Sequence, residues 1–321
     1  MSETVETYFP QIADIYQAAK TIAQVAEVTP LQQSIRYSKS HGANILLKRE
    51  DLHRVRSYKI RGAYNKISSL SKQQLESGVV CASAGNHAQG VAFACSHLQV
   101  KGTIYMPVVT PKQKIDQTMM FGGEWVNVVL EGDTFDDSKK AAELFCEQES
   151  KTFVHPFDDE KTIEGQATVG LEMLQQSHEP IDYVFVAVGG GGLASGLCGT
   201  FQALSPNTKI IGVEPEGAPS MLKSMEQGEL VELKNIDKFI DGAAVQKVGS
   251  LTYPICRDYL HKMVTVPEGK VCQTILDLYN RDAIVVEPAG ALTIAALDDF
   301  KEEIKGKNVV CVVSGSNNDI T

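Results

Sequence analysis

Four consecutive glycines, Gly189 to Gly192, form a segment that could bind an anion. They follow the apolar run 181–188 and precede small and aliphatic residues at helical spacing, so the sequence predicts a strand, a tight turn and a helix. Glycines let an anion approach the backbone N–H groups of such a turn, where the helix dipole favours negative charge. We therefore expect a phosphate site at this turn.

The residues around these glycines leave the kind of phosphate open. Gly189, Gly191 and Ala194 fit the G-x-G-x-x-G/A pattern of dinucleotide-binding folds. Glu214 lies about twenty residues further on, where an acidic group would bind a ribose. Taken alone, these residues favour an NAD-dependent oxidoreductase. A Walker A loop is excluded, because no Lys-Ser/Thr pair follows the glycines.

A second turn between a predicted strand and a predicted helix carries polar groups. It reads Ser83-Ala84-Gly85-Asn86-His87. Its N–H groups, the Ser83 hydroxyl and the Asn86 amide form a neutral donor cluster that suits a carboxylate. Two other interpretations stay open: the turn could only cap a helix, and His87 could be a buried, hydrogen-bonded histidine rather than a base.

Lys59 is a candidate nucleophile. Most lysines are solvated, but Lys59 directly precedes a predicted helix and lies between Tyr58 and Ile60. An amine among apolar neighbours loses its proton more readily and can form a Schiff base with a carbonyl compound. The sequence thus offers an amine, a carboxylate site and a phosphate site.

The composition of the chain argues against several classes of function. The 321 residues carry a net charge of −10 without any block of Lys or Arg, so nucleic acid and membrane surfaces are not expected partners. The uncharged stretch 183–208 contains four glycines and predicts a buried strand and helix rather than a membrane span. The seven cysteines form no Cys-x-x-Cys pair, and the N-terminus does not resemble a signal peptide. We expect a cytoplasmic protein.

Strand and helix patterns alternate along the chain, which predicts an α/β fold with mostly parallel sheets. The length favours two domains, a large one over 1–52 and 156–321 and a small one over 53–155. The segment 217–249 has weak periodicity and is expected to be a loop. Strands are expected at 44–48, 79–83, 102–106, 124–129, 181–188, 209–213, 283–286 and 309–313, with helices between most of them.

Five motifs follow one another along nearly the whole chain. They are Ser57-Tyr58-Lys59-Ile60-Arg61-Gly62-Ala63, Ser83-Ala84-Gly85-Asn86-His87-Ala88-Gln89-Gly90, Gly189-Gly190-Gly191-Gly192-Leu193, Glu287-Pro288-Ala289-Gly290-Ala291 and Ser314-Gly315-Ser316-Asn317. In these motifs the chain resembles the fold-type II pyridoxal-phosphate enzymes, specifically the threonine dehydratase (threonine ammonia-lyase) and serine racemase group. The segment 235–249 also resembles the catalytic domain of biosynthetic threonine dehydratases. The resemblance implies two open, twisted, mostly parallel sheets flanked by helices, the tryptophan synthase β-like fold.

The resemblance also implies a role for each motif. Lys59 would bind pyridoxal 5'-phosphate (PLP) as a Schiff base, and Tyr58, where the family usually carries Phe, would stay stacked beside it. The loop Gly189, Gly190, Gly191, Gly192 and Leu193 would hold the cofactor's phosphate. Asn86 would bind its 3'-oxygen and Ser314 its pyridine nitrogen. The substrate carboxylate would be bound by the turn residues Ser83, Ala84, Gly85, Asn86 and His87.

The implied reaction is α,β-elimination of L-threonine to 2-oxobutanoate and ammonia, with L-serine giving pyruvate, as the first step of isoleucine biosynthesis. Alternatives are a serine dehydratase or racemase, or a non-catalytic metabolite sensor on the same scaffold. Racemases of the group carry a serine at the position of Ala84, whose methyl group cannot transfer a proton.

The resemblance bears on metal binding and assembly as well. Related enzymes place a cation near the strand that ends at Glu214, and the Ala218 carbonyl could join it. Ser220 stands where an aspartate would help, so no metal is expected. By analogy with the family we expect a homodimer or homotetramer, and a C-terminal regulatory domain absent from this chain.

Overall fold

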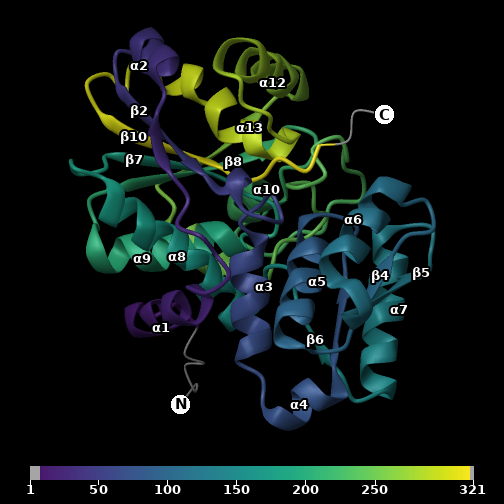
Figure 1. Cartoon of the computed structure of the whole chain (residues 1–321). Coiled ribbons are helices and arrows are strands. Elements are labelled where there is room, and N and C mark those ends of the chain that lie inside the picture. Colours follow the sequence, from purple (N-terminus) through teal and green to yellow (C-terminus); the bar gives the residue numbers. More distant parts are fainter. Residues whose placement is uncertain (1–7, 319–321) are drawn as a thin grey trace, which may run out of the picture.

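The protein is described by a computed structural model that covers residues 8–318 (Figure 1). A six-stranded sheet has the order β1-β2-β10-β7-β8-β9, in which only the β1–β2 pair is antiparallel. Its strands are β1 (Leu31–Gln33), β2 (Asn44–Arg49), β7 (Tyr183–Ala187), β8 (Lys209–Pro215), β9 (Lys262–Val266) and β10 (Asn308–Val313).

A second, four-stranded sheet has the order β5-β4-β3-β6 and is parallel throughout. Its strands are β3 (Val79–Ala82), β4 (Gly102–Met106), β5 (Val126–Leu130) and β6 (Thr152–Phe153). The predicted fold class, two mostly parallel sheets flanked by helices, is therefore confirmed. The second sheet lies within the range 53–155, although the division of the chain into domains stays a prediction.

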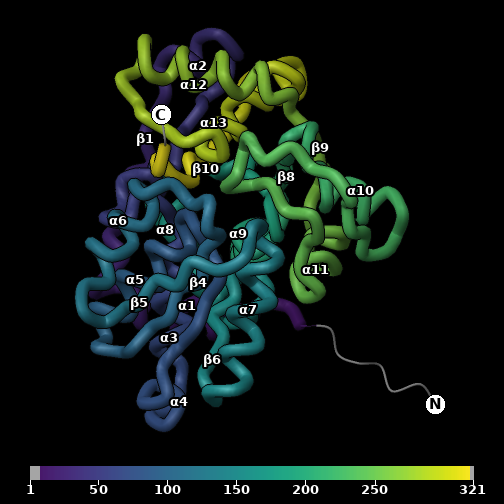
Figure 2. Tube along the Cα trace, turned by 90° about the vertical axis from the view of Figure 1, so that its right-hand side faces the viewer, coloured from purple at the N-terminus to yellow at the C-terminus, as the bar shows by residue number. Residues whose placement is uncertain are grey.

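Helices cover both faces of the large sheet. Figure 1 shows α2, α12 and α13 on one side of it and α8 and α9 on the other. α11 packs beside α9 on that second face, and α10 lies next to β9 (Figure 2). The helices are α1 (Ile12–Ile22), α2 (Ile35–His41), α3 (Lys59–Ser68), α4 (Lys72–Ser77), α5 (Asn86–Leu98), α6 (Lys112–Gly122), α7 (Phe135–Gln148), α8 (Glu160–Gln176), α9 (Gly192–Leu204), α10 (Ser220–Gln227), α11 (Thr252–Tyr259), α12 (Glu268–Asp282) and α13 (Pro288–Ala295), with short 3-10 turns η1 (Glu50–Leu52), η2 (Gly123–Trp125) and η3 (Leu297–Phe300).

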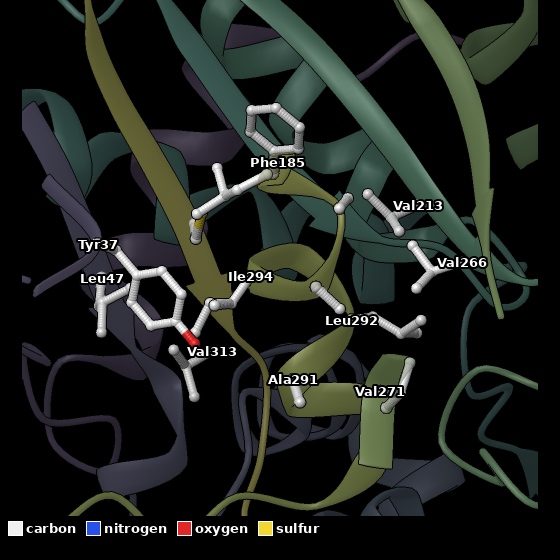
Figure 3. Packing of buried hydrophobic residues seen from close by; sticks show 14 of the residues in the cluster. Tyr37, Leu47, Phe185, Val213, Val266, Val271, Ala291, Leu292, Ile294 and Val313 are labelled. Carbon is white, nitrogen blue, oxygen red and sulfur yellow. The ribbon is translucent and has the colours of Figure 1, made fainter. Parts of the chain in front are cut away.

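The central strands β7 and β10 consist almost entirely of apolar residues because both of their faces are buried. In β10, Val309, Cys311 and Val313 pack toward α13, in the cluster drawn in Figure 3. The alternate residues Val310 and Val312 pack on the opposite face, in the cluster that includes residues of α9. β10 therefore contributes to the core on both faces of the large sheet.

Two expectations about local structure are wrong. Residues 283–286 form no strand: Ala283 ends α12 with a left-handed φ of 54°, and the segment leads directly into α13. Ile284 and Val286 are buried in the core without a neighbouring strand to pair with. The weakly periodic segment 217–249 contains the helix α10.

Each sheet has one point where its strand order reverses. In the large sheet β7, β8 and β9 follow one another outward, and β10 returns to the other side of β7. In the small sheet β3, β4 and β5 run outward and β6 returns beside β3. Ligands of open α/β sheets bind outside the carboxyl ends of the strands at such points. Within the described residues no helix has the length and apolar character needed to cross a membrane.

Candidate active site

A cavity of about 440 Å³ is lined by residues that follow the carboxyl ends of β3, β7 and β10. Every residue predicted to bind cofactor or substrate lines it. These are Tyr58, Lys59, Ser83, Ala84, Gly85, Asn86, His87, Gly189, Gly190, Gly191, Gly192, Leu193 and Ser314. Segments far apart in the sequence are thus brought to one place by the reversal points of both sheets.

Lys59 is the first residue of α3, and its amine reaches the cavity wall. Its Nζ donates a hydrogen bond to the Pro156 carbonyl (2.9 Å) and lies 5.2 Å from the centre of the Tyr58 ring. Burial lowers the pKa of Lys59 to about 8, against the opposing effect of Glu287. A substantial fraction of this amine is therefore neutral at mildly alkaline pH, as a nucleophile or base requires.

The glycine loop between β7 and α9 has no room for side chains. Gly191 has a φ of 94°, which favours glycine. A Cβ at Gly190 would lie 2.2 Å from the Phe157 ring, and one at Gly192 would lie 2.9 Å from the Phe157 backbone. The Thr252 hydroxyl donates to the Gly190 carbonyl (2.6 Å) and holds the loop from behind. The first N–H groups of α9 lack acceptors within the helix and can bind an anion.

The second polar turn does more than cap a helix. Gly85, rather than Ser83 or Asn86, is the N-cap of α5 and makes no side-chain cap. The Ser83 hydroxyl accepts a hydrogen bond from the Gly85 N–H (3.2 Å), and the Asn86 amide points toward other cavity residues. The turn therefore presents polar groups to the cavity at the start of a 13-residue helix.

His87 is a structural histidine in this turn. Its Nε2 donates to the Val154 carbonyl (2.8 Å), which places its proton on that nitrogen. Burial, with the nearby Lys59 ammonium, lowers the pKa of His87 to about 3. The ring is therefore neutral at physiological pH, and its Nδ1 has no hydrogen-bond partner among the described residues. The contact with Val154 and the burial favour the interpretation of His87 as a buried, hydrogen-bonded histidine.

Sequence reasoning missed two residues that hold Asn86. Asn86 Nδ2 donates to Glu287 Oε1 (2.7 Å), and Asn317 Nδ2 donates to Asn86 Oδ1 (2.6 Å). Burial, followed by repulsion from Asp241, raises the pKa of Glu287 to about 8. Both residues belong to motifs recognised in the sequence, but nothing in their spacing indicated that they would meet Asn86.

Ser314 directly follows β10 and contributes an unused hydroxyl. The residue is 3% exposed, and its Oγ has no hydrogen-bond partner among the described residues. A buried hydroxyl without a partner is costly. In the wall of a cavity it is therefore well suited to bind a polar atom of a ligand.

The carboxylate of Glu214 already binds backbone N–H groups of the protein. Its two carboxylate oxygens accept hydrogen bonds from the N–H groups of Met221 (2.7 Å) and Leu222 (2.9 Å) at the start of α10. The side chain is fully buried, so it is not open to a ribose. The Ser220 hydroxyl donates to a backbone carbonyl. Within residues 8–318, no three His, Cys, Asp or Glu side chains are arranged so that they could hold a metal ion.

Comparisons with known proteins identify the family of the chain. Residues 22–315 match the family described as pyridoxal-phosphate dependent enzymes. The chain is 56% identical to the L-threonine dehydratase biosynthetic IlvA of Halalkalibacterium halodurans over 97% of this chain and 75% of the relative. The corresponding Bacillus subtilis protein is 53% identical over 97% of this chain and 74% of that protein.

Solved structures give the same result. The processed form of threonine deaminase isoform 2 from Solanum lycopersicum is similar with a TM-score of 0.90 and 40% identity, covering 98% of this chain and 94% of that one. Maize serine racemase has a TM-score of 0.92 and 30% identity, covering 98% and 95%. With the family match spanning most of its length, and with an amine and a glycine loop in one cavity, this chain belongs to the pyridoxal-phosphate dependent enzymes.

Proposed function

We propose that this protein is a PLP-dependent threonine ammonia-lyase, which converts L-threonine to 2-oxobutanoate and ammonia and L-serine to pyruvate. We further propose that it provides the first step of isoleucine biosynthesis. The observation that carries the proposal is the Lys59 amine in the same cavity as the glycine loop. Identities of 53 to 56% to L-threonine dehydratases support the choice of substrate.

The cavity residues fit PLP group by group. The amine of Lys59 can react with the cofactor's aldehyde, and Gly189 to Leu193 offer backbone N–H groups to its phosphate. The unpartnered hydroxyl of Ser314 can bind the ring nitrogen. Asn86, held by Glu287, would bind the 3'-oxygen, and Tyr58 would pack beside the ring. The bound cofactor supplies the electron sink that makes the Cα proton of an amino acid acidic.

The protein groups then bind the substrate and move its protons. We assign the turn Ser83, Ala84, Gly85, Asn86 and His87 to the substrate carboxylate, because its neutral donors lie at a helix start. Lys59, with its lowered pKa, would remove the proton from Cα. Ser314 is a neutral hydroxyl and would not keep the ring nitrogen protonated. An unprotonated ring would be a weaker electron sink, which favours prompt loss of the substrate's β-hydroxyl.

A racemase function is less well supported by the cavity. Racemisation needs a second acid or base on the face of Cα opposite Lys59. Ala84 lines the cavity with a methyl group, and His87 is neutral with its Nε2 proton donated to a carbonyl. We therefore favour elimination, although the similarity to serine racemases in fold is high.

The decisive experiment combines the cofactor's spectrum with product analysis. The purified protein should be yellow, borohydride should fix PLP on Lys59, and L-threonine should yield 2-oxobutanoate. Lys59→Ala should lower kcat by about 100- to 10,000-fold, as expected for loss of a catalytic base. The variant should remain folded. Lys72→Ala, whose side chain is 92% exposed on α4, is the matched control.

Two outcomes would contradict the proposal. A colourless protein that binds NAD would point to an oxidoreductase. Formation of D-serine from L-serine as the main product would identify a racemase.

We propose a cytoplasmic homodimer or homotetramer, with the large unit of 1–52 and 156–321 and the small unit of 53–155 as its domains. Light scattering on the purified protein would give the oligomeric state. Limited proteolysis would test the domain boundaries, because cleavage is expected in exposed connections between compact units.

A further inference from the structure

Four charged side chains are buried behind Lys59, on the side of α3 away from the cavity. They are Lys48 of β2, Glu50 of η1, Arg61 of α3 and Glu172 of α8. Lys48, Glu50 and Arg61 are 0% exposed and Glu172 is 9% exposed. Two cations and two carboxylates balance one another, and none of the four lines the cavity.

Arg61 is the centre of this cluster because it pairs with both carboxylates. Its Nε and Nη2 donate to the two Glu50 oxygens (2.7 and 2.9 Å). Its Nη1 and Nη2 donate to the two Glu172 oxygens (2.6 and 2.9 Å). Lys48 Nζ adds a hydrogen bond to Glu172 (2.5 Å), and Nε2 of the buried His53 lies 3.0 Å from Glu50 Oε2. A planar guanidinium held by two forks has a fixed orientation, which a lysine ammonium would not have.

The position of Arg61 in the sequence links the cluster to Lys59. Successive residues of an α-helix are about 100° apart, so residues i and i+2 point about 200° apart. Lys59 and Arg61 therefore leave α3 on nearly opposite sides. An anchor on the Arg61 side sets the rotation of the first turn of α3, and this rotation sets the direction of the Lys59 side chain.

Close backbone contact makes this anchor rigid. A Cβ at Gly165 of α8 would lie 2.6 Å from the Gly62 Cα and 2.7 Å from the Arg61 carbonyl oxygen. On the other side of α3, a Cβ at Gly90 of α5 would lie 3.1 Å from the Lys59 carbonyl. The start of α3 is thus enclosed between α5 and α8, as its central place in Figure 1 also shows.

A buried ionic cluster of this kind is not explained by stability alone. Removing charges from water costs several kcal/mol per ion, and apolar replacements of buried ion networks are often neutral or stabilising. A cluster that contributes little net stability can still select one geometry. The geometry that it selects here includes the rotation of the helix that carries Lys59.

We propose that Arg61 is a positioning residue, whose two-sided pairing with Glu50 and Glu172 directs the Lys59 amine into the cavity. This inference rests on the proposed function, because it takes Lys59 as the residue that binds PLP. It assigns Arg61 no contact with substrate or cofactor.

The test compares two conservative variants in the PLP-loaded enzyme. Arg61→Lys keeps the charge and removes the fork. Arg36→Lys is the matched control, because Arg36 of α2 also pairs with a carboxylate through more than one N–H group, that of Asp282 at the end of α12, and neither residue lines the cavity. We expect Arg61→Lys to lower kcat about 10- to 100-fold, as a misplaced catalytic group does. The visible band of the Lys59-bound cofactor and the fraction fixed by borohydride should change with it.

Arg36→Lys should keep the parental spectrum, labelling and kcat. The inference is overturned if Arg61→Lys keeps them too, or if its losses disappear at a lower temperature where the variant is fully folded. The second result would mean that Arg61 contributes only stability.

A second variant decides the question if Arg61→Lys does not fold. Lys48→Met/Glu172→Gln removes one charge of each sign from a directly paired couple, so its thermal midpoint should stay near the parental one. Because Arg61 loses one of its two forks, we expect an altered cofactor spectrum and a reduced kcat. A parental spectrum and kcat would overturn the inference.

Borohydride labelling of the parent protein distinguishes a failure of this inference from a failure of the proposed function. If borohydride fixes PLP at another residue of the parent, both are refuted. If PLP is fixed on Lys59 and the Arg61 variant is indistinguishable from the parent, only the positioning role is refuted.

Discussion

At the residue scale, burial favours the deprotonated form of two basic side chains of the site and the protonated form of one acidic side chain. Burial lowers the pKa of Lys59 to about 8 and that of His87 to about 3, while it raises that of Glu287 to about 8. Each shift favours the uncharged form, because a charge loses its hydration inside the protein. The site therefore keeps a neutral amine within reach of pH 8 and leaves His87 without a charge.

This shift makes the uptake of PLP by cofactor-free protein dependent on pH. Only the neutral amine can attack the aldehyde, and the pKa of Lys59 is lowered from 10.5 to about 8. The rate should therefore rise as the pH increases from 6 to 9, with a midpoint near 8. Stopped-flow absorbance over this range measures it, with Lys59→Ala as the blank. A rate that still rises tenfold per pH unit at pH 9, without levelling off, would show that the amine keeps its ordinary pKa of 10.5.

At the element scale, small residues decide how closely α3 and α8 approach. Gly62 and Gly165 face each other across the contact, and Arg61 pairs with Glu172 beside them. The same helix pair supports Lys59 at the start of α3. In the proposed enzyme, packing and catalysis are therefore coupled through one helix contact.

This contact predicts a stability difference between two glycine substitutions. Gly165→Ala would place its Cβ within 2.6 to 2.9 Å of the α3 backbone, which should cost about 1–3 kcal/mol as overpacking. Gly269→Ala in α12 meets nothing within 4 Å and should gain about 0.5–1 kcal/mol from helix propensity. Urea unfolding of both variants checks this. Equal effects would mean that the α3–α8 contact is not tight.

At the scale of the whole molecule, the cavity belongs to both sheets. Ser83 to His87 follow β3 of the small sheet, whereas the glycine loop and Ser314 follow β7 and β10 of the large one. An ion pair between Lys114 and Asp241 (2.7 Å) also joins the two sides. A ligand that contacts both sides should stabilise their arrangement as well as its own site.

Removal of PLP should therefore lower the thermal midpoint of the protein. A ligand at 100 times its dissociation constant stabilises the folded state by about 2.7 kcal/mol. Calorimetry of cofactor-free protein with and without PLP measures the difference. Pyridoxal, which lacks the phosphate, should restore less stability because the glycine loop stays empty. Equal rescue by both compounds would contradict the assignment of this loop.

Much of the site could be predicted because each binding segment is local. The glycine loop and the turn before α5 each lie between a strand and a helix, and their chemistry is readable from adjacent residues. Residues 283–286 show the limit of this reasoning. Their apolar, β-branched pattern suits a strand, but a strand needs a neighbouring strand, and here the segment packs against the core between α12 and α13.

The sequence by itself determined the candidate amine, the glycine loop, the neutral turn and the alternation of strands and helices, because these depend on residues close together in the chain. Only the tertiary structure decided that Glu287 holds Asn86 from 201 residues away and that Arg61 pairs with two carboxylates. From the sequence alone, a charged side chain is expected to be exposed to solvent. Their burial, their partners and their protonation follow from contacts that exist only after the sheets and helices have packed.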